Sequence, residues 1–258
     1  MLLLSACAVT RTPTIYRIAL LAPFEGRYRE IGYNALYAAR LAFTESAFAN
    51  VELMPIDDGG SVATAVLRAR ALTHDPQVIG ALILGYQAAD SQVQAALEDI
   101  PAIIVGRWTE TRAADNVYIL SSAEIDTSLD AVTDEIDTPY LGGDVWMLEG
   151  ARLLRGSLDG ITVVTSGSIP DANFAERYAA GNQFAPDPNL LATLTYDATA
   201  FLIEAAGTGE RAAAWRLLGE GQQNGLNGVI AFGDDGYWID APINRYRFEN
   251  GVWVNAEA

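Results

Sequence analysis

The sequence predicts an α/β protein that is built on a parallel sheet. Two observations carry this prediction: short apolar runs alternate with longer segments in which apolar residues recur at helical spacing, and this unit repeats along the chain up to about residue 105. Strands that alternate with helices of such length form parallel sheets with right-handed crossovers. At 258 residues the chain is long enough for one large domain or two small lobes.

The elements of the first half follow from this pattern. We expect strands at 16–22, 51–56, 78–84 and 101–105, and helices at 30–46, 62–73 and 88–98. Ser61 precedes the second helix and is placed to cap its first turn. Because these strands run in one direction, their carboxyl ends meet at one edge of the sheet, where α/β proteins bind ligands. The loop "APFEGRYREIG", which follows the first strand, is expected at this edge.

The second half is patterned less regularly. We expect extended pieces at 117–120 and 161–164, a helix at 123–136, and two helices, 171–181 and 190–206, that pack on a second sheet. The tail segments "GVIAFGDDGYW" and "INRYRFENGVWV" are expected to form strands joined by turns, because the Asn250-Gly251 pair is a strong hairpin signal.

Composition disfavours several classes of function. The chain has 33 acidic and 16 basic residues, and its formal charge of −17 disfavours nucleic-acid binding. Every basic residue is arginine, which removes lysine-dependent chemistry. A single His74 and a single Cys7 argue against a metal centre or a catalytic triad. With no GxSxG elbow and no GxGxxG after the first strand, we expect neither an enzyme nor a cofactor.

The N-terminal segment "MLLLSACAVTRTPT" has a different character. Its Leu4-Ser5-Ala6-Cys7 resembles the lipobox of bacterial lipoproteins, so residues 1–14 are expected to be a signal and tether with Cys7 lipidated. The apolar run is shorter than a usual signal core and no basic residue precedes it, which leaves a disordered terminus as the alternative. No other run approaches the ~18 apolar residues of a membrane-spanning helix.

The order of the parts resembles the type I periplasmic binding proteins, the solute receptors of ABC importers. The matching segments are "RIALLAPFEGRYREIGYNALYAARLAFTE", "VELMPIDDGGSVATAVLRARALTHDPQVIGALIL", "LTYDATAFLIEAA" and "LNGVIAFGDDGYWIDAPINRYRFENGVWV". The resemblance implies a Rossmann-like N-terminal lobe over 15–118. It also implies a C-terminal α/β lobe over 119–258 that includes the crossing segments and the closing hairpin.

The second lobe departs from this family. Only residues 121–140 separate "VYIL" from Leu141-Gly142-Gly143, where the family has a further run of strands and helices. One parallel crossover needs about a dozen residues, so the second lobe is expected to be reduced. A reduced sheet exposes strand edges. We therefore expect either a homodimer through this lobe or a covering role for the helix at 123–136.

The resemblance also implies where a ligand lies, between the lobes. From the first lobe the expected contacts are Tyr28, Gly85, Tyr86, Gln87, Arg107, Trp108 and Thr109, and from the second lobe Asp144 and Trp146. The loop "LGYQAAD" lacks the serines that hold a carboxylate in amino-acid receptors, which puts amino-acid specificity in doubt.

Each of these residues has a role and most have a structural alternative. Arg107 is a candidate carboxylate clamp or a surface partner of Glu110. Trp108 is a pocket wall or a packing residue between lobes. Asp144 is an ammonium acceptor or part of a turn, and Trp146 is expected to close over the ligand. Asp57 and Asp58 are expected to have a structural role, in which they stabilise the turn that contains Gly59 and Gly60.

The expected function is therefore that of a lipid-anchored extracytoplasmic receptor. It would bind a small polar solute, such as an amino acid or amide, and present it to an ABC permease in the membrane. A ligand sensor or degenerate binding protein without a transport role is the alternative, and an α/β enzyme is the less favoured one.

Overall fold

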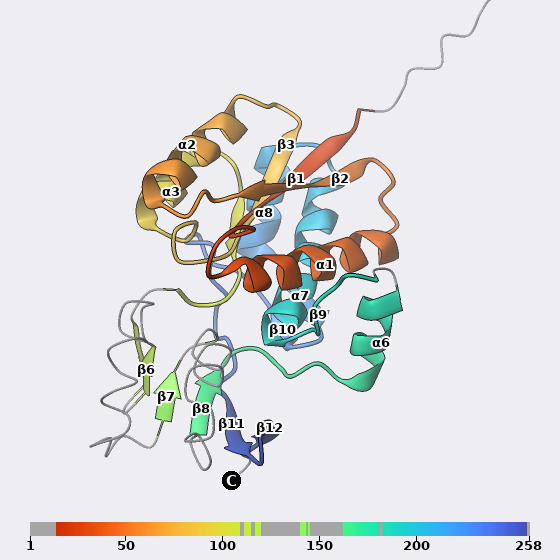
Figure 1. Cartoon of the computed structure of the whole chain (residues 1–258). Helices are drawn as coiled ribbons and strands as arrows, with labels where there is room; N and C mark the ends of the chain where they lie inside the picture. The colour runs from red at the N-terminus through yellow and green to blue at the C-terminus, as the bar shows by residue number, and fades with distance from the viewer. Residues whose placement is uncertain are drawn as a thin grey trace, which may run out of the picture.

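The computed structural model describes residues 14–108, 111–114, 117–119, 140–142, 144, 162–180 and 183–256 (Figure 1). Cys7, Thr109, Trp146 and the helix expected at 123–136 lie outside the described residues.

Sheet A is the parallel sheet that the sequence predicted. Its strands are β1 (Tyr16–Ala22), β2 (Val51–Asp57), β3 (Val78–Ile83) and β4 (Ala102–Ile104), in the order β2-β1-β3-β4. All three pairings are parallel. Strand β3 and residues 18–22 of β1 are buried throughout, as expected for central strands that helices cover on both faces.

The helices of the first half agree with the sequence pattern, with one difference in length. They are α1 (Arg29–Glu45), α2 (Val62–Thr73) and α3 (Ser91–Ala96). The Ser61 hydroxyl caps α2 by accepting the N–H of Thr64 at 3.2 Å. Helix α3 is shorter than the predicted 88–98, because Asp90 caps it by accepting the N–H of Gln92 and because Glu98 adopts a left-handed φ of 53°.

Three helices of the second half lie among the described residues. They are α6 (Ala172–Ala180), α7 (Leu190–Ala206) and α8 (Arg211–Glu220), of which the sequence pattern predicted the first two. The expectation that α6 and α7 pack on a second sheet is wrong: α6 packs on α1, and α7 packs on α1 and on strands β1 and β3 of sheet A. Nearly every residue of α7 is buried, so its own pattern gives no single face that would indicate its partner.

Helices cover both faces of sheet A. Figure 1 shows α2 and α3 on one side of the sheet and α1 and α7 on the other, where α8 also contacts β3. The division into 1–14, 15–118 and 119–258 stays a prediction, and α7 and α8 from the last segment pack on the sheet of the second.

Sheet B is a mixed sheet. Its strands are β5 (Thr111–Ala114), β6 (Val117–Ile119), β7 (Tyr140–Gly142), β8 (Thr162–Thr165), β11 (Asn244–Glu249) and β12 (Val252–Asn255). The order is β12-β11-β8-β7-β6-β5; the neighbours among β6, β7 and β8 are parallel, and the outer pairs are antiparallel.

The closing hairpin is confirmed. Asn250 and Gly251 join β11 to β12 with φ of 51° and 86°, the two positive values that a type I′ turn requires. A smaller hairpin, β9 (Gln223–Gly225) with β10 (Gly228–Ile230), follows α8. The expected homodimer stays a prediction.

Candidate functional site

The carboxyl ends of strands from both sheets meet at Asp144. This residue follows β7, Ser166 follows β8, and Arg107 follows β4 of sheet A. The Asp144 carboxylate accepts the backbone N–H of Arg107 at 3.1 Å, the N–H of Ser166 at 3.3 Å and the hydroxyl of Thr165. Asp144 thereby ties the edge of sheet A to that of sheet B.

Burial defines the electrostatics of this tie. Asp144 is 1% exposed, and burial raises the pKa of its carboxyl because the charged form loses its hydration. The hydrogen bonds from Thr165, Ser166 and Arg107 oppose that rise. The carboxylate therefore depends on these three donors for its solvation.

A row of aromatic rings lies at the carboxyl edge of sheet A. The ring centroids of Tyr28 and Tyr86 are 5.3 Å apart, and those of Tyr86 and Trp108 are 5.2 Å apart in an edge-to-face arrangement. The guanidinium of Arg27 lies 5.3 Å from the Tyr28 ring centroid. The structure thus brings together three residues that the sequence pointed to from three separate loops.

Gly85 allows this edge to pack closely. Its φ is +108°, and a Cβ atom at this position would lie 2.9 Å from Cδ of Pro23 and 3.7 Å from an oxygen of Asp58. Gln87, two residues further on, is half-buried. Gly85 therefore lets the loop after β3 approach the loop after β1.

Trp108 is part of the packed wall. It is 2% exposed, and its indole N–H donates to the carbonyl oxygen of Val105 at 2.6 Å. The indole N–H is thus hydrogen-bonded within its own loop, and the ring packs edge-to-face against Tyr86.

The acidic turn after β2 is structural, as the sequence indicated. Asp57 accepts the N–H groups of Phe24 and Gly59, and Asp58 accepts the N–H of Gly60. The second carboxylate oxygen of Asp58 is buried without a hydrogen-bond partner among the described residues. Burial raises the pKa of Asp58, and the neighbouring charge of Asp57 raises it further.

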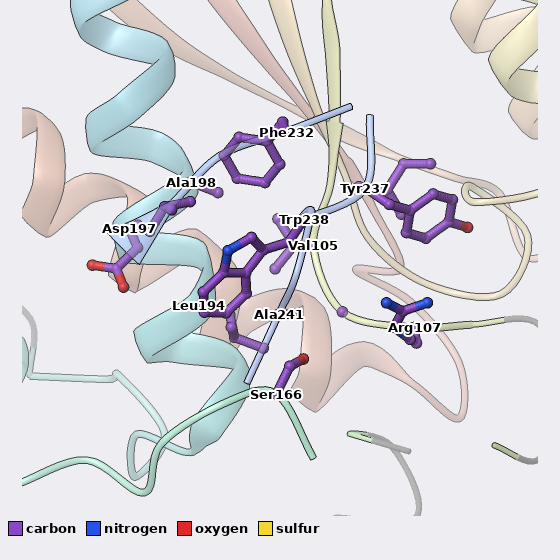
Figure 2. A pocket seen from close by; sticks show the side chains of 13 residues that line it. Val105, Arg107, Ser166, Leu194, Asp197, Ala198, Phe232, Tyr237, Trp238 and Ala241 are labelled. Atoms are coloured by element: carbon purple, nitrogen blue, oxygen red, sulfur yellow. The ribbon is translucent and has the colours of Figure 1, made fainter. Parts of the chain in front are cut away.

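A cavity opens between β4, α7 and the segment after β10 (Figure 2). Its empty space is about 430 Å³ with the open mouth included, but the enclosed part has room for little more than one water molecule. The lining residues are Ile104, Val105, Gly106, Arg107, Ser166, Leu194, Asp197, Ala198, Ile230, Phe232, Tyr237, Trp238 and Ala241. Of the expected ligand contacts, Arg107 alone lines it.

The turn that carries Phe232 and Trp238 docks on β4. These two residues form an antiparallel bridge, and the N–H of Ile104 donates to the carbonyl oxygen of Gly236 at 2.9 Å. Gly236 has a φ of +75°, and a Cβ atom there would lie 2.5 Å from the carbonyl oxygen of Ala102. Only glycine fits this approach.

Asp197 lines the cavity, but its charge is directed elsewhere. It accepts the N–H groups of Leu226 and Asn227 and the side-chain amide of Asn227, at 2.7 to 2.9 Å. Figure 2 shows its carboxylate pointing away from Arg107 and Trp238. Burial raises its pKa, against these hydrogen bonds.

Sequence reasoning missed the aromatic part of this cavity. Phe232, Tyr237 and Trp238 flank the glycine-rich turn Gly233–Gly236, and that concentration of rings around a turn was the available signal. Ser166 and Leu194 carried no such signal. They reach the cavity only through the packing of segments that are distant in the sequence, and no local pattern reports such packing.

Neither a metal cluster nor a membrane-spanning helix occurs in the described part of the chain. Among the described residues, no group of three or more histidine, cysteine, aspartate or glutamate side chains could hold a metal ion. Within the same residues, no helix has the length and apolar character to cross a membrane.

The comparisons with known proteins point to one fold. No protein-family model matches the sequence, and no curated protein matches it. Among solved structures, the leucine-binding protein LivK of Thermotoga maritima aligns at a TM-score of 0.67 and 15% identity, over 94% of this chain and 98% of that one.

Two further structures widen the range of ligands among such proteins. The branched-chain amino acid receptor LivJ of Streptococcus pneumoniae, in complex with isoleucine, aligns at a TM-score of 0.64 and 13% identity, over 93% of this chain and 98% of that one. A solute-binding protein of an ABC transporter from Rhodopseudomonas palustris, in complex with 3,4-dihydroxybenzoic acid, aligns at a TM-score of 0.66 and 13% identity. The alignment covers 93% of this chain and 95% of that one. The chain therefore has the fold of the type I periplasmic binding proteins, as the order of its sequence segments predicted.

Proposed function

We propose that the chain is the extracytoplasmic solute receptor of an ABC importer and that it holds a small polar solute between its two sheets. The observation that carries this proposal is the meeting of the two carboxyl edges at Asp144, since ligands of open α/β sheets bind at such edges. Solved structures of the same fold bind leucine, isoleucine and hydroxybenzoate, which makes a small solute the natural class of ligand.

The proposed contacts are the residues that the sequence pointed to. Tyr28, Gly85, Tyr86 and Gln87 form the rim on sheet A, with Trp108 as the support beneath Tyr86. Arg107 lines the cavity, and Asp144 fixes its loop. Thr109 and Trp146 remain proposed contacts outside the described residues.

Binding would act on the distance between the two sheets. A solute that contacts Arg107 on one side and Ser166 on the other favours the closed arrangement by its differential affinity for it. The closed form would then be presented to a membrane permease. Lipidation of Cys7 would keep the receptor at the membrane. The permease partner and the lipid anchor are both part of the proposal.

A sensor without a transport role is the second candidate. The observation that favours it is that the Asp144 carboxylate itself ties the two edges by hydrogen bonds. A tie of this kind would limit the opening on which transport depends. The two candidates differ in whether the molecule changes shape when it binds.

The proposal is tested by binding and shape together. Thermal-shift screening against amino acids, amides, urea and small carboxylates should find a ligand that raises the melting temperature. Small-angle scattering with that ligand should then show a smaller radius of gyration. Binding without compaction would favour the sensor, and the absence of any hit across the panel would contradict the receptor proposal.

A further inference from the structure

We infer that the cavity between β4, α7 and the segment after β10 takes a small carboxylate with an apolar or aromatic body, and that Arg107 binds its carboxylate group. This inference rests on the proposed function, and it goes further by naming the chemical class of the solute. It also separates this chain from receptors that need the ammonium group of an amino acid.

The walls of the cavity are apolar on three sides. Val105 follows β4, Leu194 and Ala198 come from α7, and Phe232 and Trp238 come from the segment after β10. Figure 2 shows the Trp238 ring in the middle of this group, beside Leu194. Such walls favour an apolar or aromatic body, with polar groups left to fix its orientation.

Arg107 is the cation of the cavity. It lines the cavity, and no ion pair joins its guanidinium to another of the described residues, although its charge attracts the nearby Asp144 carboxylate. The neighbouring Asp144 takes its hydrogen bond from the backbone N–H of Arg107 and not from the side chain. Within the described part of the chain, the planar guanidinium thus keeps donors that match a carboxylate in a bidentate pair.

Among the described residues that line the same cavity, an ammonium group would find no charged partner that is still available. Asp197 is the acid that lines it, and three donors from residues 226 and 227 already engage that carboxylate. Asp144 is buried and engaged by three donors of its own. An amino acid would therefore have to desolvate its ammonium group without compensation, which weakens binding.

The net negative charge of the chain restricts the recognition of an anionic ligand to short distances. A formal charge of −17 repels anions at long range, and this repulsion is screened beyond about 8 Å at physiological salt. Recognition of an anion therefore depends on short-range contacts, among them the contact with Arg107. Arg107 follows β4 of sheet A and Ser166 follows β8 of sheet B, so the size of the cavity depends on how the two sheets are placed.

The test uses matched ligands with the full chain. Leucine differs from 4-methylpentanoate only by its α-ammonium group, and 3-methylbutylamine has the ammonium without the carboxylate. Isothermal calorimetry at neutral pH with these ligands and benzoate should show binding of a carboxylate. It should show binding of leucine at least about tenfold weaker than that of 4-methylpentanoate, and none of the amine.

Variants locate the site. Arg107→Gln should weaken carboxylate binding by at least about tenfold. Arg107→Lys should retain part of the affinity, because lysine keeps the positive charge but cannot form the bidentate pair of a guanidinium. Arg40→Gln, at an exposed position of α1, is the matched control and should bind as the wild type does. Trp238→Phe should remove most of the fluorescence change on binding. Circular dichroism of each variant shows whether the fold is retained.

The outcomes separate the two proposals. Leucine binding more tightly than 4-methylpentanoate, or equal carboxylate affinity in the wild type and in a folded Arg107→Gln, overturns this inference and leaves the receptor proposal standing. No binding by any ligand of this panel overturns the inference. The receptor proposal fails with it only if the wider screen of amides, urea and amino acids is also empty.

Discussion

Removal of the Asp144 carboxylate tests the tie between the two sheets most directly. Asp144→Ala leaves three donors without their acceptor: the N–H groups of Arg107 and Ser166 and the hydroxyl of Thr165. A hydrogen bond to a buried charged acceptor contributes about 1.5 kcal/mol or more, which gives about 4 to 5 kcal/mol for the three. Burial of the charge itself is unfavourable, as the raised pKa of Asp144 shows, and this offsets part of the loss.

We therefore expect Asp144→Ala to lower the free energy of unfolding by about 2 to 4 kcal/mol. Urea unfolding followed by circular dichroism measures it as a shift of the midpoint at constant slope. Asp144→Asn, which keeps the shape and one acceptor, should lose less. Asp234→Ala, at an exposed position in the glycine-rich turn, is the control and should stay within about 0.5 kcal/mol of the wild type. An Asp144→Ala variant as stable as that control would refute the reasoning.

Three further predictions concern the fold around the site. Gly236→Ala should destabilise the protein more than Gly26→Ala, because both have positive φ but only Gly236 meets the carbonyl oxygen of a neighbouring strand; equal midpoints in urea would contradict the docking of its turn on β4. Leu202→Ala should cost about 2 to 5 kcal/mol, since this fully buried side chain of α7 packs on β3, and a loss below about 1 kcal/mol would argue against that packing. The pKa of Asp58 is raised in the folded state, so its ionised form costs stability above that pKa and the cost fades as the pH falls toward the unfolded value of 3.8. As the pH is lowered from 7 to 4, the free energy of unfolding of the wild type should therefore rise relative to that of Asp58→Asn. A difference between the two proteins that does not change with pH would contradict this assignment.

Much of sheet A was predictable because its signals are local. The apolar runs of β1 to β4 and the helical spacing of α1 and α2 can be read within a few residues, and so can the Ser61 cap and the Asn250-Gly251 turn. The three aromatic residues at the edge of this sheet were predicted together for a related reason. In a parallel sheet, the loops after neighbouring strands must meet at one edge.

The packing of α7 was predicted wrongly, and the cavity was predicted only at Arg107. Helix α7 is buried on nearly all sides, so its own sequence could not show whether it covers sheet A or sheet B. The cavity draws its walls from residues 104–107, 166, 194–198 and 230–241, which are distant along the chain. No periodicity within one segment reports on such an assembly.

The sequence by itself determined the strands and helices of the first half, the edge at which their loops gather, and the hairpin that closes the chain. These follow from side-chain spacing and turn chemistry, which act over a few residues. Only the tertiary structure decided that Asp144 joins the two sheets, that Asp197 is engaged by its own neighbours, and that Arg107 faces a hollow lined by Phe232 and Trp238. Those outcomes depend on burial and on hydrogen bonds between segments far apart in the chain, and both exist only once the chain has folded.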